Sequence, residues 1–176
     1  MTMNVYANEK TAPVIVEAEA AAGLQKLAQI FCGDIEKVTG HRPMCVNGWQ
    51  ENTSDHILVA TCDNSKILEK LEAQKEVDLS QIRGKREVYG IFCLENVPKA
   101  GKTTLVIAGS DKRGAAYGMF YLSQKMGVSP WVFWADAVPE KRETIVFDQS
   151  IETISKEPSV RYRGFFINDE QPCFGN

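Results

Sequence analysis

The chain has 176 residues, of which 44% are hydrophobic and 24% charged, and its formal net charge is -3 at pH 7. This length fits one globular domain with a short tail and is sufficient to bury a hydrophobic core. The acidic balance argues against a nucleic-acid-binding surface, and the basic cluster at 83–86 is offset by Glu87, which indicates a solvated loop. No apolar run in the sequence approaches the ~20 residues of a membrane span, so no membrane partner is expected.

The five cysteines are odd in number and lack the C-x-x-C spacing of metal sites. Those inside apolar runs are expected to be structural thiols, because free cysteine behaves as a small hydrophobe. His41 and His56 are too isolated to indicate a metal site or a catalytic triad. We therefore expect no metal and no cofactor. The first residues show no signal peptide, which leaves the compartment open.

Strand-like runs alternate with helical patterns along the chain. β-branched runs predict strands over 13–17, 43–46, 56–62, 87–94, 103–109 and 144–147. Apolar residues spaced by three and four predict a long helix from residue 19 to Gly40 and another from Asp111 to Gly127, with a short helix over 66–73. This order predicts an α/β (α+β) fold, a mixed sheet with two long helices mainly on one face.

The sequence divides at about residue 150. Residues 1–150 are predicted to form the α/β domain, and 151–176 a linker followed by a strand over 161–167. A single strand cannot bury two faces, so it either adds to the first sheet or opens a second domain. We favour the second possibility, the first strand of a TIM barrel whose remainder is absent.

The start of the second long helix carries the first candidate site. Lys112 and Arg113 place cations in the first helical turn, where they oppose the helix dipole. A helix N-terminus with added cations is suited to an anion such as a uronate carboxylate. The structural alternative is that both side chains point to solvent or pair with a neighbouring acid. The small residues at 114–118 indicate close packing of this helix on the sheet and not ligand contact.

Two further groups have both a functional and a structural interpretation. Trp131 and Trp134 could stack on sugar rings, but aromatic residues beside a proline more often seal an interface. Asn168, Asp169 and Glu170 gather polar groups after the last predicted strand. Glycoside hydrolysis usually needs two carboxyl groups across one bond, and neighbouring strand residues point to opposite faces. At most one of the two acids would serve such a site, and the alternative is a polar exit from the strand.

Two separated blocks of sequence resemble glycoside hydrolase family 115, the xylan α-1,2-glucuronidases. The first contains SDKRG at 110–114, YG at 117–118, GVSPW at 127–131 and WAD at 134–136; the second contains YRG at 162–164 and FINDE at 166–170. The chain departs from the family pattern at Phe133, where Trp is expected, and at Gln171, where a small residue is expected. Accessory domains of families 20 and 67 share a weaker version of the first block.

The resemblance implies an accessory domain that precedes a TIM-like catalytic barrel. It implies a parent enzyme that removes glucuronic acid or its 4-O-methyl ether from xylan side chains by an inverting route, with the present chain inactive by itself. Asn168 and Asp169 would lie in the sugar pocket, and Lys112 or Arg113 would contribute at the domain boundary. The partners would be a glucuronoxylan-derived oligosaccharide or polysaccharide and the missing barrel, with a homodimer of the parent as a further option. A secreted or periplasmic location follows from the family, and a cytoplasmic one stays open.

Two alternatives come from other classes of protein. The chain could be a freestanding carbohydrate-binding module that uses Trp131 and Trp134 as a platform. It could also be the accessory domain of another polysaccharide hydrolase, such as a hexosaminidase.

Overall fold

The computed structural model describes residues 2–48, 55–97, 99–132, 135–164 and 166. A six-stranded sheet runs in the order β4 (Cys45–Asn47), β3 (Val14–Val16), β5 (His56–Thr61), β7 (Thr103–Gly109), β6 (Tyr89–Glu95) and β9 (Thr153–Ile154). The first four of these strands pair in parallel, whereas β6 and β9 join antiparallel. The predicted mixed sheet is therefore confirmed.

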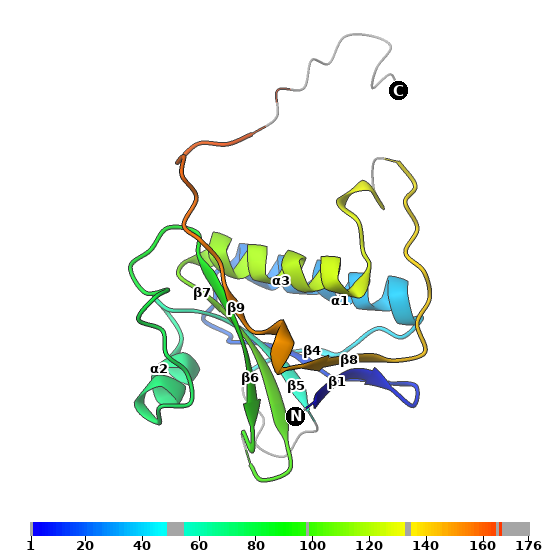
Figure 1. Cartoon of the computed structure of the whole chain (residues 1–176), viewed down its shortest axis with the longest axis horizontal. Helices are drawn as coiled ribbons and strands as arrows, with labels where there is room; N and C mark the ends of the chain where they lie inside the picture. Colours follow the sequence, from blue (N-terminus) through cyan, green and yellow to red (C-terminus); the bar gives the residue numbers. More distant parts are fainter. Residues whose placement is uncertain (1, 49–54, 98, 133–134, 165, 167–176) are drawn as a thin grey trace.

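Three helices cover the sheet unequally. The long helices α1 (Ala22–Thr39) and α3 (Lys112–Met126) lie side by side on one face, and the short α2 (Lys66–Ala73) lies on the other, as Figure 1 shows. Every residue of β5 is buried because both of its faces are covered, as is usual for a strand within a parallel sheet. Consecutive residues of β5, such as Ile57 and Leu58, therefore point to opposite faces of the sheet and belong to two different hydrophobic cores. The predicted placement of two long helices on one face is confirmed.

The small residues at the start of α3 allow this helix to approach its neighbours closely. A Cβ atom on Gly118 would lie 2.5 Å from Cγ2 of Ile107, and one on Gly114 would lie 2.2 Å from the carbonyl oxygen of Val88. Both distances are shorter than the contacts that Cβ atoms make in real structures, so a side chain at either position would clash. The interpretation of these glycines as packing residues is confirmed.

A second, three-stranded sheet was not anticipated at the N-terminus. It consists of β1 (Thr2–Ala7) between β2 (Lys10–Thr11) and β8 (Ile145–Asp148), all antiparallel. Asn8 and Glu9 form the two-residue turn with φ of 50° and 60°, a conformation suited to a tight hairpin. Met3 and Val5 are fully buried and extend the core under α1 and α3. Their alternation with polar residues and the Asn in the turn were the available signals.

The C-terminal part of the chain also differs from expectation. The segment expected as a linker contains the 3-10 turn η2 (Gln149–Ile151) and β9, which pairs with β6 at the edge of the main sheet. No strand forms at residues 161–164 and 166, because no backbone partner lies beside them in the described structure. Residues 165 and 167 are outside the described part. The assignment of this region to a second domain stays a prediction.

Candidate functional site

Two arginines from distant parts of the chain converge on Glu87. This residue precedes β6, has a left-handed backbone with φ of 59°, and exposes 4% of its side chain. Nη1 of Arg113, in the first turn of α3, lies 3.0 Å from Oε1 of Glu87. Arg163, near the C-terminus, donates from Nη2 to the other carboxylate oxygen and, at 3.3 Å, to the hydroxyl of Tyr117. We call Glu87, Arg113, Tyr117 and Arg163 the Glu87 cluster.

The backbone around Glu87 is fixed by the start of α3. Asp111 is the N-cap of this helix, and its Oδ1 accepts hydrogen bonds from two N–H groups of the first turn. Its Oδ2 accepts a third from the N–H of Glu87 at 3.0 Å. Val88 and Ser110 exchange two more bonds, because Ser110 N–H donates to Val88 O at 2.8 Å and Val88 N–H donates to Ser110 Oγ at 2.9 Å. The backbone at Glu87 is thus held in place independently of the arginine partners.

The burial of Glu87 makes its partners important. Breaking a fully buried ion pair by removing one partner costs roughly 3–5 kcal/mol, because a charge is left uncompensated. The cost here is smaller, since the Arg113 and Arg163 side chains are 56% and 33% exposed and solvent screens them. The hydrogen bond to Glu87 raises the pKa of Arg163 above its ordinary value. Glu87 is therefore a structural acceptor for two guanidinium groups and not a free general base.

The contacts of Arg113 and Lys112 agree with the structural interpretation of the helix start, and an anion site there stays a prediction. Arg113 pairs with a neighbouring acid, which was the structural alternative, whereas Lys112 is exposed at the first position of α3. The basic cluster at 83–86 lies in a largely exposed loop, as expected, whereas the side chain of Glu87 that follows it is buried. Asn168, Asp169 and Glu170 lie outside the described residues, so their place in a sugar pocket stays a prediction.

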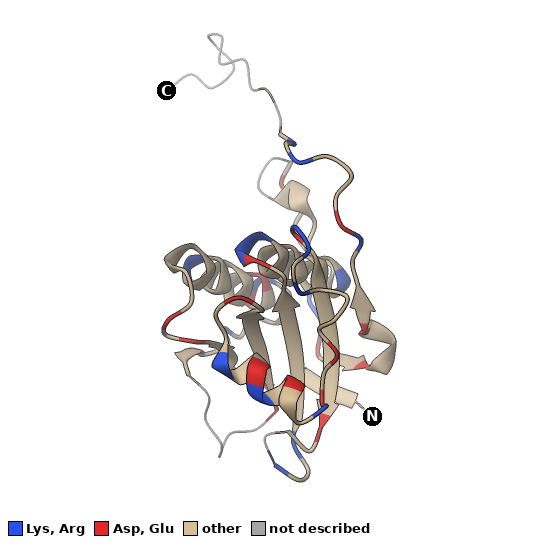
Figure 2. Cartoon of the chain, turned by 90° about the vertical axis from the view of Figure 1, so that its left-hand side faces the viewer, with Lys and Arg blue, Asp and Glu red and all other residues tan. Residues whose placement is uncertain are grey.

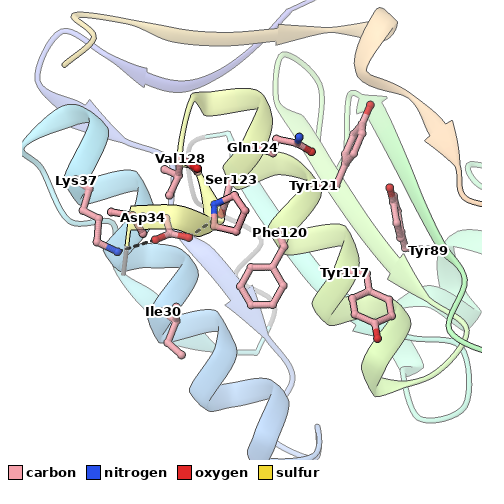
Figure 3. Close-up of a pocket in the computed structure, with 13 residues that line it drawn as sticks. Ile30, Asp34, Lys37, Tyr89, Tyr117, Phe120, Tyr121, Ser123, Gln124 and Val128 are labelled. Atoms are coloured by element: carbon pink, nitrogen blue, oxygen red, sulfur yellow. Dashed lines mark hydrogen bonds and ion pairs between the residues drawn. The ribbon is translucent and has the colours of Figure 1, made fainter. Parts of the chain in front are cut away.

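A groove of about 710 Å³ opens on the outer side of the α1 and α3 layer. Figure 3 shows Ile30 of α1 and Phe120 of α3 along it, with Tyr117 and Tyr121 also on α3 and Tyr89 of β6 near Tyr121. Burial, and secondarily the nearby Tyr121, raises the pKa of Tyr89, so this phenol stays neutral. The lining is thus largely aromatic and apolar.

One carboxylate is buried beside the groove. Asp34 of α1 accepts a hydrogen bond from Ser123 Oγ of α3 at 2.9 Å and pairs with Lys37 Nζ at 2.8 Å, as the dashed lines in Figure 3 indicate. These contacts satisfy both oxygens and tie the two helices together. Asp34 is therefore part of the helix packing, a role that its position on the predicted helix did not reveal.

Two segments rise from the sheet on the same side as the groove. One follows α3 and contains the 3-10 turn η1 (Pro130–Val132), and the other is the tail after β9 (Figure 1). Trp131 in η1 is 62% exposed, as expected of a residue that contacts either a partner or a sugar. Trp134 and Phe133 lie outside the described residues. The groove thus lies between two segments that carry motifs of the family 115 resemblance.

The surface offers little support for other kinds of site. Lysine, arginine, aspartate and glutamate are intermingled on the face seen in Figure 2, without a basic stripe. Among the described residues, no cluster of histidine, cysteine or acidic side chains could hold a metal ion. In that same part of the chain, no helix has the length and apolar character needed to cross a membrane.

Comparison with solved structures identifies the fold. The chain superposes on the family GH115 4-O-methyl-α-glucuronidase BtGH115A with a TM-score of 0.71 and 32% sequence identity, over 91% of this chain and 19% of that one. The chain has a GH115-like fold. This GH115-like domain also matches the structure of CpGH84D with a TM-score of 0.51 and 11% identity, over 74% of this chain and 19% of that one, which shows the fold alone. No family model matches the sequence, and no curated protein matches it.

The comparison relates the chain to one part of a larger enzyme. BtGH115A is described as specific for decorated arabinogalactans, and the GH115-like domain spans about a fifth of its length. The similarity extends over nine tenths of the present chain, well beyond the two sequence blocks. The structural similarity supports a glycoside hydrolase-like domain.

Proposed function

We propose that this GH115-like domain is the accessory domain of a glycoside hydrolase that releases glucuronic acid or its 4-O-methyl ether from polysaccharide side chains. The observation that carries the proposal is the 32% identity with a 4-O-methyl-α-glucuronidase over 91% of the chain. The chain spans 19% of that enzyme, so we place the catalytic centre in a further domain. By itself the accessory domain would be inactive.

The groove between α1 and α3 supports a scaffolding role. Large apolar side chains are exposed along this side, with Ile30 at 51%, Phe120 at 43% and Trp131 at 62%. Ile30 and Phe120 line the groove, and Trp131 lies in the η1 turn that borders it; exposed apolar surface of this kind usually marks an interaction site. We assign it to the catalytic domain because the motif segments around η1 and the tail flank it. A homodimer that uses the same face is the competing outcome.

The residues after Gly164 would supply one edge of the catalytic pocket. Asn168 and Asp169 are proposed as sugar contacts, with Glu170 beside them, in line with the family resemblance. An inverting reaction needs an acid and a base roughly 6.5–9.5 Å apart, so at least one of the pair would come from the further domain. Lys112 is the remaining cation for a uronate carboxylate, since Arg113 is engaged by Glu87.

The test compares the longer parent protein with this chain alone. Uronic acid release is measured from glucuronoxylan and from decorated arabinogalactan, because the first is expected from the sequence blocks and the second is the specificity of BtGH115A. We expect release by the parent and none by the isolated chain. Release by the isolated chain would refute the scaffold role. Activity of the parent on amino-sugar glycosides alone would favour the hexosaminidase alternative.

A freestanding carbohydrate-binding module is the second candidate, favoured by the exposed Trp131 and the aromatic groove. It predicts quenching of tryptophan fluorescence by xylan or arabinogalactan fragments, with loss of binding in Trp131→Ala. The scaffold role predicts no saturable binding to either glycan. Titration of the isolated chain separates the two functions.

A further inference from the structure

The tail of the chain follows a fixed course along the edge of the domain. After β9, Ser155 and Tyr89 exchange two hydrogen bonds, from Ser155 N–H to Tyr89 O at 2.8 Å and from Tyr89 N–H to Ser155 Oγ at 3.0 Å. Farther on, Arg86 Nη2 donates to the carbonyl oxygen of Pro158 at 2.7 Å. Arg163 then closes the path at Glu87. We call residues 155–163 the strap.

The last contact of the strap differs from the others in its burial. The earlier contacts use backbone groups or half-buried side chains, whereas Arg163 reaches a carboxylate that is 4% exposed. Arg163 Nη1 also donates to the carbonyl oxygen of Val160 at 2.6 Å, which folds the strap back on itself. Its bond to Tyr117 adds a contact with α3. One side chain therefore joins the strap to the loop before β6 and to α3.

The two sequence blocks of the family resemblance meet at this point. Arg113 and Tyr117 belong to the first block, Arg163 belongs to the second, and Glu87 belongs to neither. The left-handed backbone of Glu87 is unfavourable for a non-glycine residue. Asp111 holds it in that conformation through the N–H bond at 3.0 Å. The N-cap of α3 thus orients the carboxylate that receives Arg163.

We propose that Glu87 is a positioning residue that locks the strap onto α3 and so sets the direction in which the chain leaves the domain. Tyr117 and Tyr89, which touch the strap, also line the groove. The lock therefore aligns the departing chain with the groove face. Given the proposed function, it fixes the start of the catalytic domain relative to the surface on which that domain docks.

Trypsin provides a direct test on the chain alone, because it must bind an arginine side chain in order to cleave after it. In the native protein, cleavage after Arg163 is expected to be slow, since Glu87 holds its guanidinium group. Arg161 lies over the ring of Tyr162 and serves as the internal reference. In Glu87→Gln, cleavage after Arg163 should rise about tenfold or more relative to the native protein, because proteolysis follows the population of the open state. Arg161→Gln is the control on the strap, because it removes a positive charge two residues before Arg163 and leaves Glu87 in place, so Arg163 should stay protected.

A second measurement guards against general unfolding of Glu87→Gln. In Arg163→Gln the substitution lies on the strap, and amide ¹⁵N relaxation should show increased motion of residues 159–164 with unchanged signals from β5 and β7. Strap amides that are equally mobile in the native protein and in Arg163→Gln would overturn the proposal. So would cleavage after Arg163 that does not respond to Glu87→Gln in a folded protein. These outcomes do not depend on the activity of the parent, so the lock and the proposed function can fail separately.

Discussion

Replacement of Gly114 by alanine tests how closely α3 approaches the loop that carries Glu87. The new Cβ atom would lie 2.2 Å from the carbonyl oxygen of Val88, about 0.8 Å inside the 3.0 Å limit that real Cβ atoms respect. The obstacle is backbone, and it cannot rotate away as a side chain could. Val88 is also joined to Ser110 by two hydrogen bonds, so movement of either segment strains both.

The expected loss of stability follows from two destabilising contributions and one stabilising contribution. Overpacking of this kind typically costs ~1–3 kcal/mol, and a stretched hydrogen bond adds about 1 kcal/mol. Alanine in place of glycine within a helix stabilises the helix by up to about 1 kcal/mol. The net loss is therefore roughly 1–3 kcal/mol. For a domain of this size each kcal/mol lowers Tm by about 2–4 °C, so a decrease of roughly 2–12 °C is expected.

Thermal unfolding followed by circular dichroism, together with urea titration, measures this change. Gly23→Ala is the matched control, because Gly23 lies in α1 and a Cβ atom there meets nothing within 4 Å. This control should equal or exceed the native Tm. A Gly114→Ala protein that is folded and at least as stable as the native one would show that α3 does not contact the Val88 carbonyl as closely as described.

Three further predictions concern the core, the helix cap and the thiols. Met3→Ala should destabilise the domain by about 2–5 kcal/mol, as truncation of a buried methionine does. The control is Met44→Ala, at a side chain that is 70% exposed, which should change the free energy of unfolding by less than about 0.5 kcal/mol. Equal effects of the two variants in urea titrations would contradict the role of β1 in the core. Asp111→Ala removes three accepted hydrogen bonds and should cost about 0.5–2 kcal/mol, with faster trypsin cleavage after Arg163 if the cap orients the Glu87 loop. Burial raises the pKa of Cys32 from 9.0 to about 12, so the unfolded thiol ionises first and stability should fall as the pH rises from about 9 towards 12. A Cys32→Ala protein should lose this part of the pH dependence, and an unchanged alkaline slope would refute the assignment.

The sequence alone determined the main sheet, apart from its edge strand β9, and the three helices of the described structure. The apolar periodicity of α1, the β-branched runs of β5 and β7 and the glycines after both long helices are local signals, and each element formed where its signal lay. The small residues of α3 were interpreted correctly for the same reason, since a glycine within a helix needs a packing explanation. The two hydrophobic cores lie on opposite faces of the sheet, with both long helices packed on the first.

The tertiary structure decided which distant strands and which charged side chains pair. Strands β1 and β9 pair with β8 and β6, which are distant in sequence, so local patterns gave weak signals for them. Arg113 and Arg163 are 50 positions apart, and only the loop geometry at Glu87 brings both guanidinium groups to one carboxylate. The same holds for Asp34 and Ser123, whose bond joins α1 to α3. Charge pairing in a folded protein depends on the path of the backbone, and that path is the outcome of the whole core and not of any single segment.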